Sequence, residues 1–143
     1  MPSPPDSLVD LLEASVAAHG SRAAFLTKES GRWSETSYAA FARVVDELRG
    51  GLAALGIAPG DRVGIIANNR IEWAAIAYAT YGLGAALVPM YESQPAREWT
   101  FIARDNTGQS RLADAQPPTR RADAGGHYTL WLGLVNLGLE KQF

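Results

Sequence analysis

The 143-residue sequence contains no cysteine. This absence excludes disulfides, thiolate catalysis, zinc–thiolate sites and iron–sulfur clusters together. There are only two histidines, His19 and His127, and they lie far apart in the sequence. The sequence therefore gives no basis for a metal centre, and we assign no metal-ligating residue.

An excess of positive charge is also absent. The formal net charge is -2 and the calculated isoelectric point is about 5.6. Binding to nucleic acid or to an anionic membrane surface relies on clustered lysine and arginine, so we expect neither partner. Residues 1–6 lack the basic and apolar regions of a signal peptide, which predicts a cytoplasmic location. The apolar segment 128–139 is shorter than the roughly 20 residues of a membrane span, and no transmembrane segment is expected.

The first 107 residues are interpreted as a flexible start (1–6) followed by a domain over 7–107. Apolar residues at helical spacing predict a helix over 8–20 that is capped by Asp6 or Ser7. Two short strands at 23–27 and 32–36 flank a polar connection ending in Gly31, as in a β-hairpin. A longer amphipathic helix over 38–55 is predicted to begin after Ser37 and to stop at Gly56.

Residues 62–89 indicate the core of an α/β fold. A strand at 62–67, a helix at 72–81 and a second apolar strand at 85–89 form the unit that gives two parallel strands with a right-handed crossover. Ser93 and Pro95 then suit the start of another helix that continues to about residue 106. The sequence therefore predicts a parallel β-α-β core.

The pattern changes after that helix. A doubly wound fold places a further apolar strand within a few residues, but 108–114 contains one large apolar residue. We expect 108–127, rich in Arg, Asp, Ala, Gly and Pro, to be a disordered linker, and 128–143 to be an apolar C-terminal segment that is poorly packed. Self-association through this segment is one consequence, because exposed apolar surface promotes aggregation.

Several residues have both a functional and a structural interpretation. Asn68, Asn69 and Arg70 follow a strand, where α/β sheets bind ligands, but capping of the next helix is the favoured interpretation. Tyr91 and Glu92 follow the second strand and either face a pocket or are simply solvated. His19 is placed at a helix end, where a cation favours the helix dipole.

Three further groups are weaker candidates. A phosphate-binding turn follows a strand and opens a helix, whereas the glycines at 50, 51, 82 and 84 end or interrupt helices. Arg120 and Arg121 are too few for a phosphate-binding patch and are expected in an exposed loop. We therefore assign no catalytic, cofactor-binding or metal residue.

Three motifs in order carry a resemblance to a known family. They are Thr-Ser-Tyr-Ala-Ala-Phe at 36–41, Leu-Gly-Ile-Ala-Pro-Gly-Asp-Arg-Val at 55–63 and Tyr-Gly-Leu-Gly-Ala-Ala-Leu-Val-Pro-Met-Tyr-Glu at 81–92. Their order and spacing resemble the start of the adenylate-forming (AMP-binding) acyl-CoA synthetases, and Val-Pro-Met-Tyr-Glu resembles the long-chain fatty acid CoA ligases. The resemblance spans residues 8–106 and implies a partial N-terminal subdomain of an acyl-CoA synthetase.

The family converts a fatty acid, ATP and coenzyme A to acyl-CoA, AMP and pyrophosphate, with Mg²⁺. This sequence has no segment resembling the family's phosphate loop, its Tyr-Gly-x-Thr-Glu motif, its ribose-binding Asp or its C-terminal-domain Lys. The resemblance therefore implies a truncated ligase that is inactive alone and binds no cofactor itself.

Two alternatives belong to other classes of protein. One is a non-catalytic interaction module that pairs with a full-length ligase through residues 128–143. The other is a small flavodoxin-like nucleotide-binding protein, which would need a phosphate loop that the sequence lacks.

Overall fold

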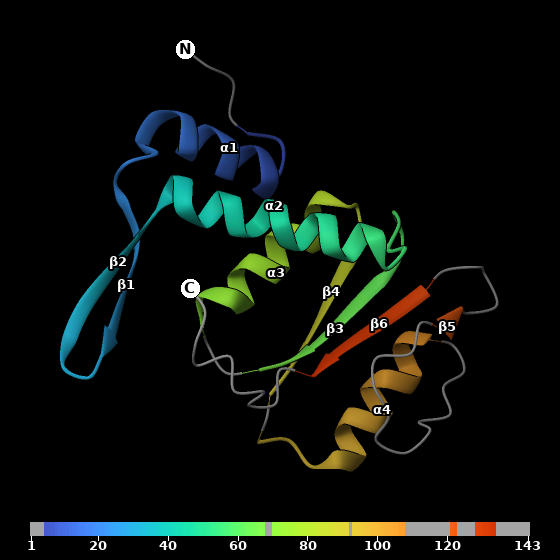
Figure 1. Cartoon of the computed structure of the whole chain (residues 1–143). Helices are drawn as coiled ribbons and strands as arrows, with labels where there is room; N and C mark the ends of the chain where they lie inside the picture. The colour runs from blue at the N-terminus through green and yellow to red at the C-terminus, as the bar shows by residue number, and fades with distance from the viewer. Residues whose placement is uncertain (1–4, 68–69, 92, 108–120, 123–127, 134–143) are drawn as a thin grey trace.

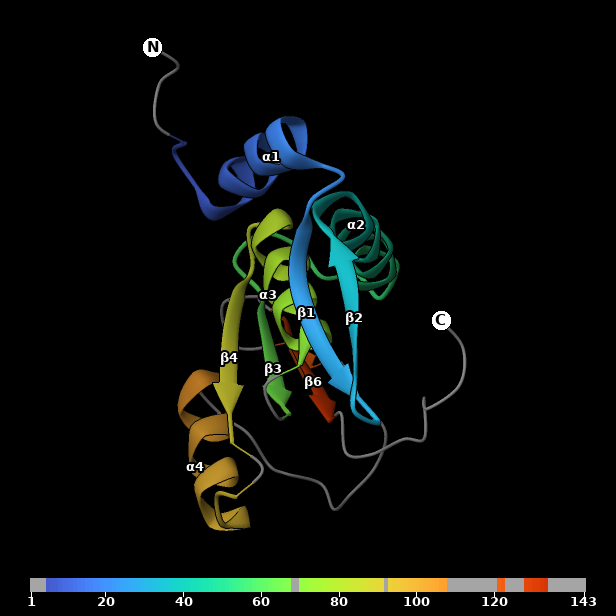
Figure 2. The same cartoon turned by 90° about the vertical axis from the view of Figure 1, so that its left-hand side faces the viewer.

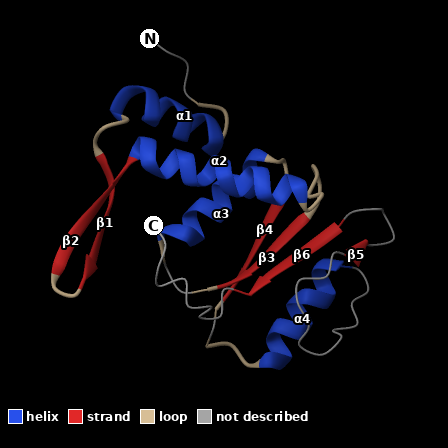
Figure 3. Cartoon of the chain, in the orientation of Figure 1, coloured by secondary structure: helices blue, strands red, loops and turns tan. Residues whose placement is uncertain are grey.

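The computed structural model describes residues 5–67, 70–91, 93–107, 121–122 and 128–133. These residues form a two-stranded hairpin and a four-stranded sheet with the strand order β4-β3-β6-β5. Helices α1, α2 and α3 lie on one side of the larger sheet and α4 lies on the other (Figure 1). The hairpin projects away from this α/β unit (Figure 3). The predicted α/β class is confirmed.

The N-terminal elements follow their local signals. Helix α1 (Leu8–His19) begins after Ser7, whose hydroxyl accepts a hydrogen bond from the backbone N–H of Asp10 at 3.1 Å. Strands β1 (Ala23–Glu29) and β2 (Arg32–Ser37) pair antiparallel. Their connection, Ser30-Gly31, has positive φ at both residues (48° and 81°), as a tight hairpin turn of the right twist requires.

Helix α2 (Tyr38–Ala54) starts directly after the hairpin. Ser37 is its N-cap, because the Ser37 hydroxyl accepts the N–H of Ala40 at 3.1 Å. One orphan donor of the first turn is thereby satisfied. The chain leaves the helix through Gly56, with φ of 85°. The predicted cap and stop residues are confirmed.

The predicted parallel unit is present. Strand β3 (Arg62–Ile66) and strand β4 (Ala86–Met90) are parallel neighbours in the sheet, and helix α3 (Ile71–Gly82) connects them in the sequence. Two further backbone hydrogen bonds join the starts of these strands. The N–H of Gly60 donates to the carbonyl of Gly84 at 2.9 Å, and the N–H of Ala86 donates to the carbonyl of Asp61 at 2.8 Å. Gly84 has φ of 68° in this turn.

A further strand corrects the prediction for the C-terminal part. Helix α4 (Ala96–Thr107) is followed by the short β5 (Arg121–Ala122) and by β6 (Tyr128–Gly133), which pairs in parallel with β3. The strand that the pattern lacked after α4 is therefore supplied by the apolar segment. The rest of the predicted linker (108–127) and of the predicted apolar segment (128–143) lies outside the described residues, and the domain boundaries stay predictions.

The core lies between β3 and the helices α2 and α3. Val63 and Ile65 of β3 are fully buried, as is Ala79 of α3. Phe41 of α2 is 2% exposed and joins this core to the hairpin: its ring lies 4.8 Å from that of Phe25 in β1. The two rings are tilted by 54° to each other, and such aromatic pairs stabilise a fold beyond the apolar area that they bury. The hairpin is thus anchored at its base.

Among the residues described, no helix combines the length and the apolar character needed to cross a bilayer.

Replacement of Ser37 by alanine tests the cap of α2. We expect Ser37→Ala to lower the free energy of unfolding by about 1 kcal/mol, because the N–H of Ala40 loses its acceptor. Urea denaturation followed by circular dichroism measures the change. Ser34→Ala is the control, since Ser34 is exposed and its hydroxyl lies 3.4 Å from its acceptor, so we expect less than about 0.5 kcal/mol. Equal losses in the two variants would contradict the assigned cap.

Replacing two glycines by alanine should change the free energy of unfolding in opposite directions. Gly84→Ala should destabilise the chain by about 1–2 kcal/mol, because alanine resists a φ of 68°. A Cβ there would also lie 3.2 Å from Pro59. Gly50→Ala should stabilise it by about 0.5–1 kcal/mol, because Gly50 lies inside α2 with open space around an added Cβ. Thermal melting of both variants measures the two shifts. The same sign in both would refute this account.

Candidate functional site

The topology indicates that a ligand would bind at one end of the strands. From β3 the chain crosses through α3 to β4, and from β4 it crosses back through α4 to reach β6 on the other side of β3. Figure 2 shows β4, β3 and β6 side by side with their arrowheads at the same end. Open α/β sheets bind ligands outside the carboxyl ends of strands where the crossover direction reverses. The carboxyl ends of β3, β4 and β6 are therefore the candidate site.

A cavity of about 240 Å³ lies at this end, next to β3 and β4. It is lined by residues that follow or end the two strands and by the first turn of α3: Ala67, Trp73, Pro89, Met90 and Tyr91. Met90 is 3% exposed and Tyr91 is 71% exposed, so the cavity runs from the core out to solvent.

The backbone after β4 is held in place by α4 and by the turn before it. The indole Nε1 of Trp99 donates to the carbonyl of Tyr91 at 2.9 Å, and Gln94 Oε1 accepts the N–H of Tyr91 at 2.8 Å. Gln94 in turn donates to Glu98 at 3.3 Å. These bonds position Tyr91 at the cavity. Glu92, the candidate named together with Tyr91, lies outside the described residues.

The cavity lining does not fit the polar parts of ATP. None of the five lining residues is basic or acidic, whereas phosphate groups bind to cations or clustered N–H groups and Mg²⁺ binds to oxygen ligands. Within the described part of the chain, no three His, Cys, Asp or Glu side chains are grouped to hold a metal ion. The described lining instead suits an apolar or aromatic group, and no catalytic step follows from it.

The Asn68-Asn69-Arg70 segment differs from the prediction. The N-cap of α3 is Arg70, not an asparagine, and its side chain makes no capping hydrogen bond. Arg70 instead lies 3.4 Å from Glu72, within an exposed ion pair in the first turn. A guanidinium offers no acceptor for an N–H group, so the Arg70 side chain cannot cap this helix. Asn68 and Asn69 lie outside the described residues.

The candidate glycines serve backbone geometry. Gly82 ends α3, and its surface is covered by Arg49, whose Cδ would lie 3.0 Å from an added Cβ. Gly84 forms the turn before β4, and the pair at 50–51 lies within α2. None of these positions opens a helix after a strand, which is the arrangement that a phosphate loop needs.

The remaining candidates lie apart from the cavity. His19 is exposed in the last turn of α1, and its ring lies 6.4 Å from that of Tyr38. Arg121 belongs to β5 rather than to the predicted loop, and Arg120 lies outside the described residues.

Sequence reasoning did not propose Trp73, Met90 or Trp99 as site residues. Met90 belongs to the Val-Pro-Met-Tyr-Glu motif, which was the available signal, whereas the two tryptophans belong to no motif. Only the parallel pairing of β3 and β4 brings the first two together.

Comparison with known proteins agrees with this topology. Residues 12–123 match the family described as AMP-binding enzyme. The long-chain-fatty-acid CoA ligase FadD15 of Mycobacterium tuberculosis is 34% identical over 76 residues, which cover 53% of this chain and 13% of the ligase. The chain thus spans a small part of this relative's length.

Solved structures show the same fold. A putative long-chain-fatty-acid CoA ligase from Rhodopseudomonas palustris superimposes with a TM-score of 0.63 and 27% identity, covering 71% of this chain and 25% of the ligase. The N-terminal domain of FACL13 from Mycobacterium tuberculosis has a TM-score of 0.67 at 24% identity, covering 90% of this chain and 34% of that one. The family match extends over well more than half of the sequence, and the chain belongs to the AMP-binding enzyme family.

Proposed function

We propose that this sequence supplies the N-terminal α/β unit of a long-chain fatty acid CoA ligase. The observation that carries the proposal is the family match over residues 12–123 together with the 34% identity to FadD15. The parent reaction would join a fatty acid to coenzyme A, with ATP supplying the adenylyl group that activates the carboxylate. On the sequence grounds given above, we also propose a cytoplasmic location.

Within such an enzyme, this unit would act as scaffold. The carboxyl ends of β3 and β4 offer an apolar cavity, and the bonds from Trp99 and Gln94 hold its rim. None of the five described residues that line the cavity carries a charge for binding ATP or Mg²⁺. The unit would therefore contribute shape and a hydrophobic surface, while groups that bind phosphate would come from other segments of the enzyme.

The chain alone is expected to be inactive in adenylation. We expect no fatty-acid-dependent exchange of labelled pyrophosphate into ATP, because no segment resembles the family's phosphate loop. A complete long-chain fatty acid CoA ligase, assayed in parallel, shows that the reagents support exchange. Exchange by the 143-residue chain that requires fatty acid, and that survives repeated purification, would overturn this part of the proposal.

The alternative function, pairing with a full-length ligase through residues 128–143, draws less support from the fold. The backbone of 129–133 is paired with β3 along one edge, whereas β5 pairs only with Tyr128 and Thr129 on the other edge. The edge that faces β3 is therefore not free for a partner strand. Docking through that edge would require β6 to leave the sheet.

Two deletions separate a structural role from a docking role. A chain ending at residue 127 should melt at a lower temperature than the full chain, by roughly 4 °C for each kcal/mol lost, because β3 loses a parallel neighbour. A chain ending at residue 133 keeps β6 and is the matched control. If 1–127 melts like the full chain and a co-expressed full-length ligase binds the full chain but not 1–127, the docking alternative replaces the structural one.

A further inference from the structure

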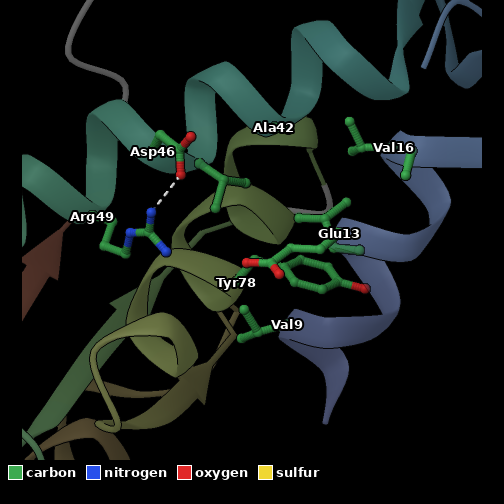
Figure 4. A pocket seen from close by; sticks show the side chains of 10 residues that line it. Val9, Glu13, Val16, Ala42, Asp46, Arg49 and Tyr78 are labelled. Carbon is green, nitrogen blue, oxygen red and sulfur yellow. Dashed lines mark hydrogen bonds and ion pairs between the residues drawn. The ribbon is translucent and has the colours of Figure 1, made fainter. Parts of the chain in front are cut away.

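A second cavity lies far from the strand ends, where α1 packs beside α2 and α3 (Figure 4). Its volume is about 330 Å³, within the range of small-molecule pockets and equal to the liquid volume of on the order of ten waters. The cavity is lined by all three helices: Val9, Leu12, Glu13, Val16 and Ala17 of α1, Ala42, Val45, Asp46 and Arg49 of α2, and Tyr78 of α3.

The walls of this interhelical cavity are apolar. Leu12 is 9% exposed and Val45 is 5% exposed, so both belong to the buried core. Val9 and Val16 are half-buried, and Figure 4 shows them on the α1 side. An aliphatic group would replace water along these walls at a favourable free energy.

Arg49 is already engaged. Its Nη2 donates to Asp46 Oδ1 at 2.8 Å, the bond drawn as a dashed line in Figure 4. Its methylene stem lies over Gly82, where an added Cβ would come within 3.0 Å of the Arg49 Cδ. The guanidinium is therefore held against α2 and α3 and neutralises the charge of Asp46.

Glu13 is the remaining charge at the cavity. Its exposed side chain extends from α1 into the cavity in Figure 4, and it forms no ion pair or hydrogen bond with any residue that the structure describes. Two carboxylates and one guanidinium leave this site one negative charge. Tyr78 adds an aromatic ring from α3, and the face of such a ring attracts cations.

We propose that this interhelical cavity binds an amphiphile with an aliphatic body and a protonated amine. The body lies along Val9, Val16 and Val45, and the ammonium group lies between the Glu13 carboxylate and the Tyr78 ring. A fatty acid carries the opposite charge and is disfavoured by Glu13 and Asp46. The ligand is thus distinct from the acid substrate of the proposed ligase, and the site does not depend on that function.

The first experiment titrates the full 143-residue chain with octylammonium chloride below its micellar concentration. Two-dimensional NMR of the valine methyl groups follows the cavity walls directly. We expect saturable chemical-shift changes at Val9, Val16 and Val45 with octylammonium. We expect the affinity for octanoate to be lower by about fivefold or more. Equal affinities for the two amphiphiles, or no saturable shift with octylammonium, would overturn the proposal.

Charge variants test the head group. Glu13→Gln should weaken octylammonium binding about two- to fivefold and leave octanoate binding equal or stronger, since the exposed charge at the site acts partly through solvent. Glu47→Gln is the matched control, because Glu47 is exposed on α2 and does not line the cavity. A Glu13→Gln variant that binds octylammonium as tightly as the parent would refute the role of the carboxylate.

A larger side chain in the cavity tests where the aliphatic part of the ligand binds. Ala42→Leu places extra methyl groups in the space between the helices and should weaken octylammonium binding at least tenfold. Ala53→Leu makes the same change on an exposed part of α2 and should leave binding unchanged. Circular dichroism confirms that both variants fold. Unchanged binding in a folded Ala42→Leu variant would place the ligand elsewhere and overturn the proposal.

Discussion

Strand β3 is hydrogen-bonded along both of its edges, to β4 on one side and to β6 on the other. Its side chains Val63 and Ile65 are fully buried beneath the helices. A parallel strand that is buried in this way cannot satisfy its backbone groups with water, so both neighbours are needed. The direction of β3 also fixes which end of the sheet carries the candidate site. Sheet, core and cavity therefore depend on this five-residue segment.

The same strand explains how the peripheral elements are held. Helix α3 packs on the sheet and α2 packs on α3, while Phe41 carries the contact outward to Phe25 in the hairpin. On its other side the Phe41 ring meets Tyr78 at 5.8 Å, nearly edge to face. Tyr78 also lines the interhelical cavity, so one chain of aromatic contacts links the hairpin, the core and that cavity.

Local signals predicted much of this arrangement. The hydroxyl of Ser37 and the turn at Ser30-Gly31 specify their elements through bonds and dihedral angles a few residues long. The parallel unit at 62–89 was also predictable, because its two apolar strands flank a helix of the right length. Helix α3 shows the limit of such rules, since its N-cap residue is Arg70, whose side chain makes no capping hydrogen bond. Packing of its buried residues, among them Ala75, Ile76 and Ala79, stabilises this helix instead.

The placement of β6 was not predictable in the same way. Its partner β3 lies more than sixty positions earlier in the sequence, as in the pair Val63 and Leu130, and no local pattern encodes that register. Because lengthening a connection adds little to the entropy cost of closing it, an apolar segment far along the sequence can still pair with the free edge of β3. The two cavities were hidden for a related reason, because their linings come together only after the helices and strands pack. Their different chemistry follows from that packing. Strand ends here bring together aromatic and apolar residues, whereas α1 and α2 carry charged side chains to the border of an apolar space that Tyr78 of α3 also lines. The second arrangement joins charge to an apolar cavity, and it is the one that can distinguish ligands by the sign of their charge.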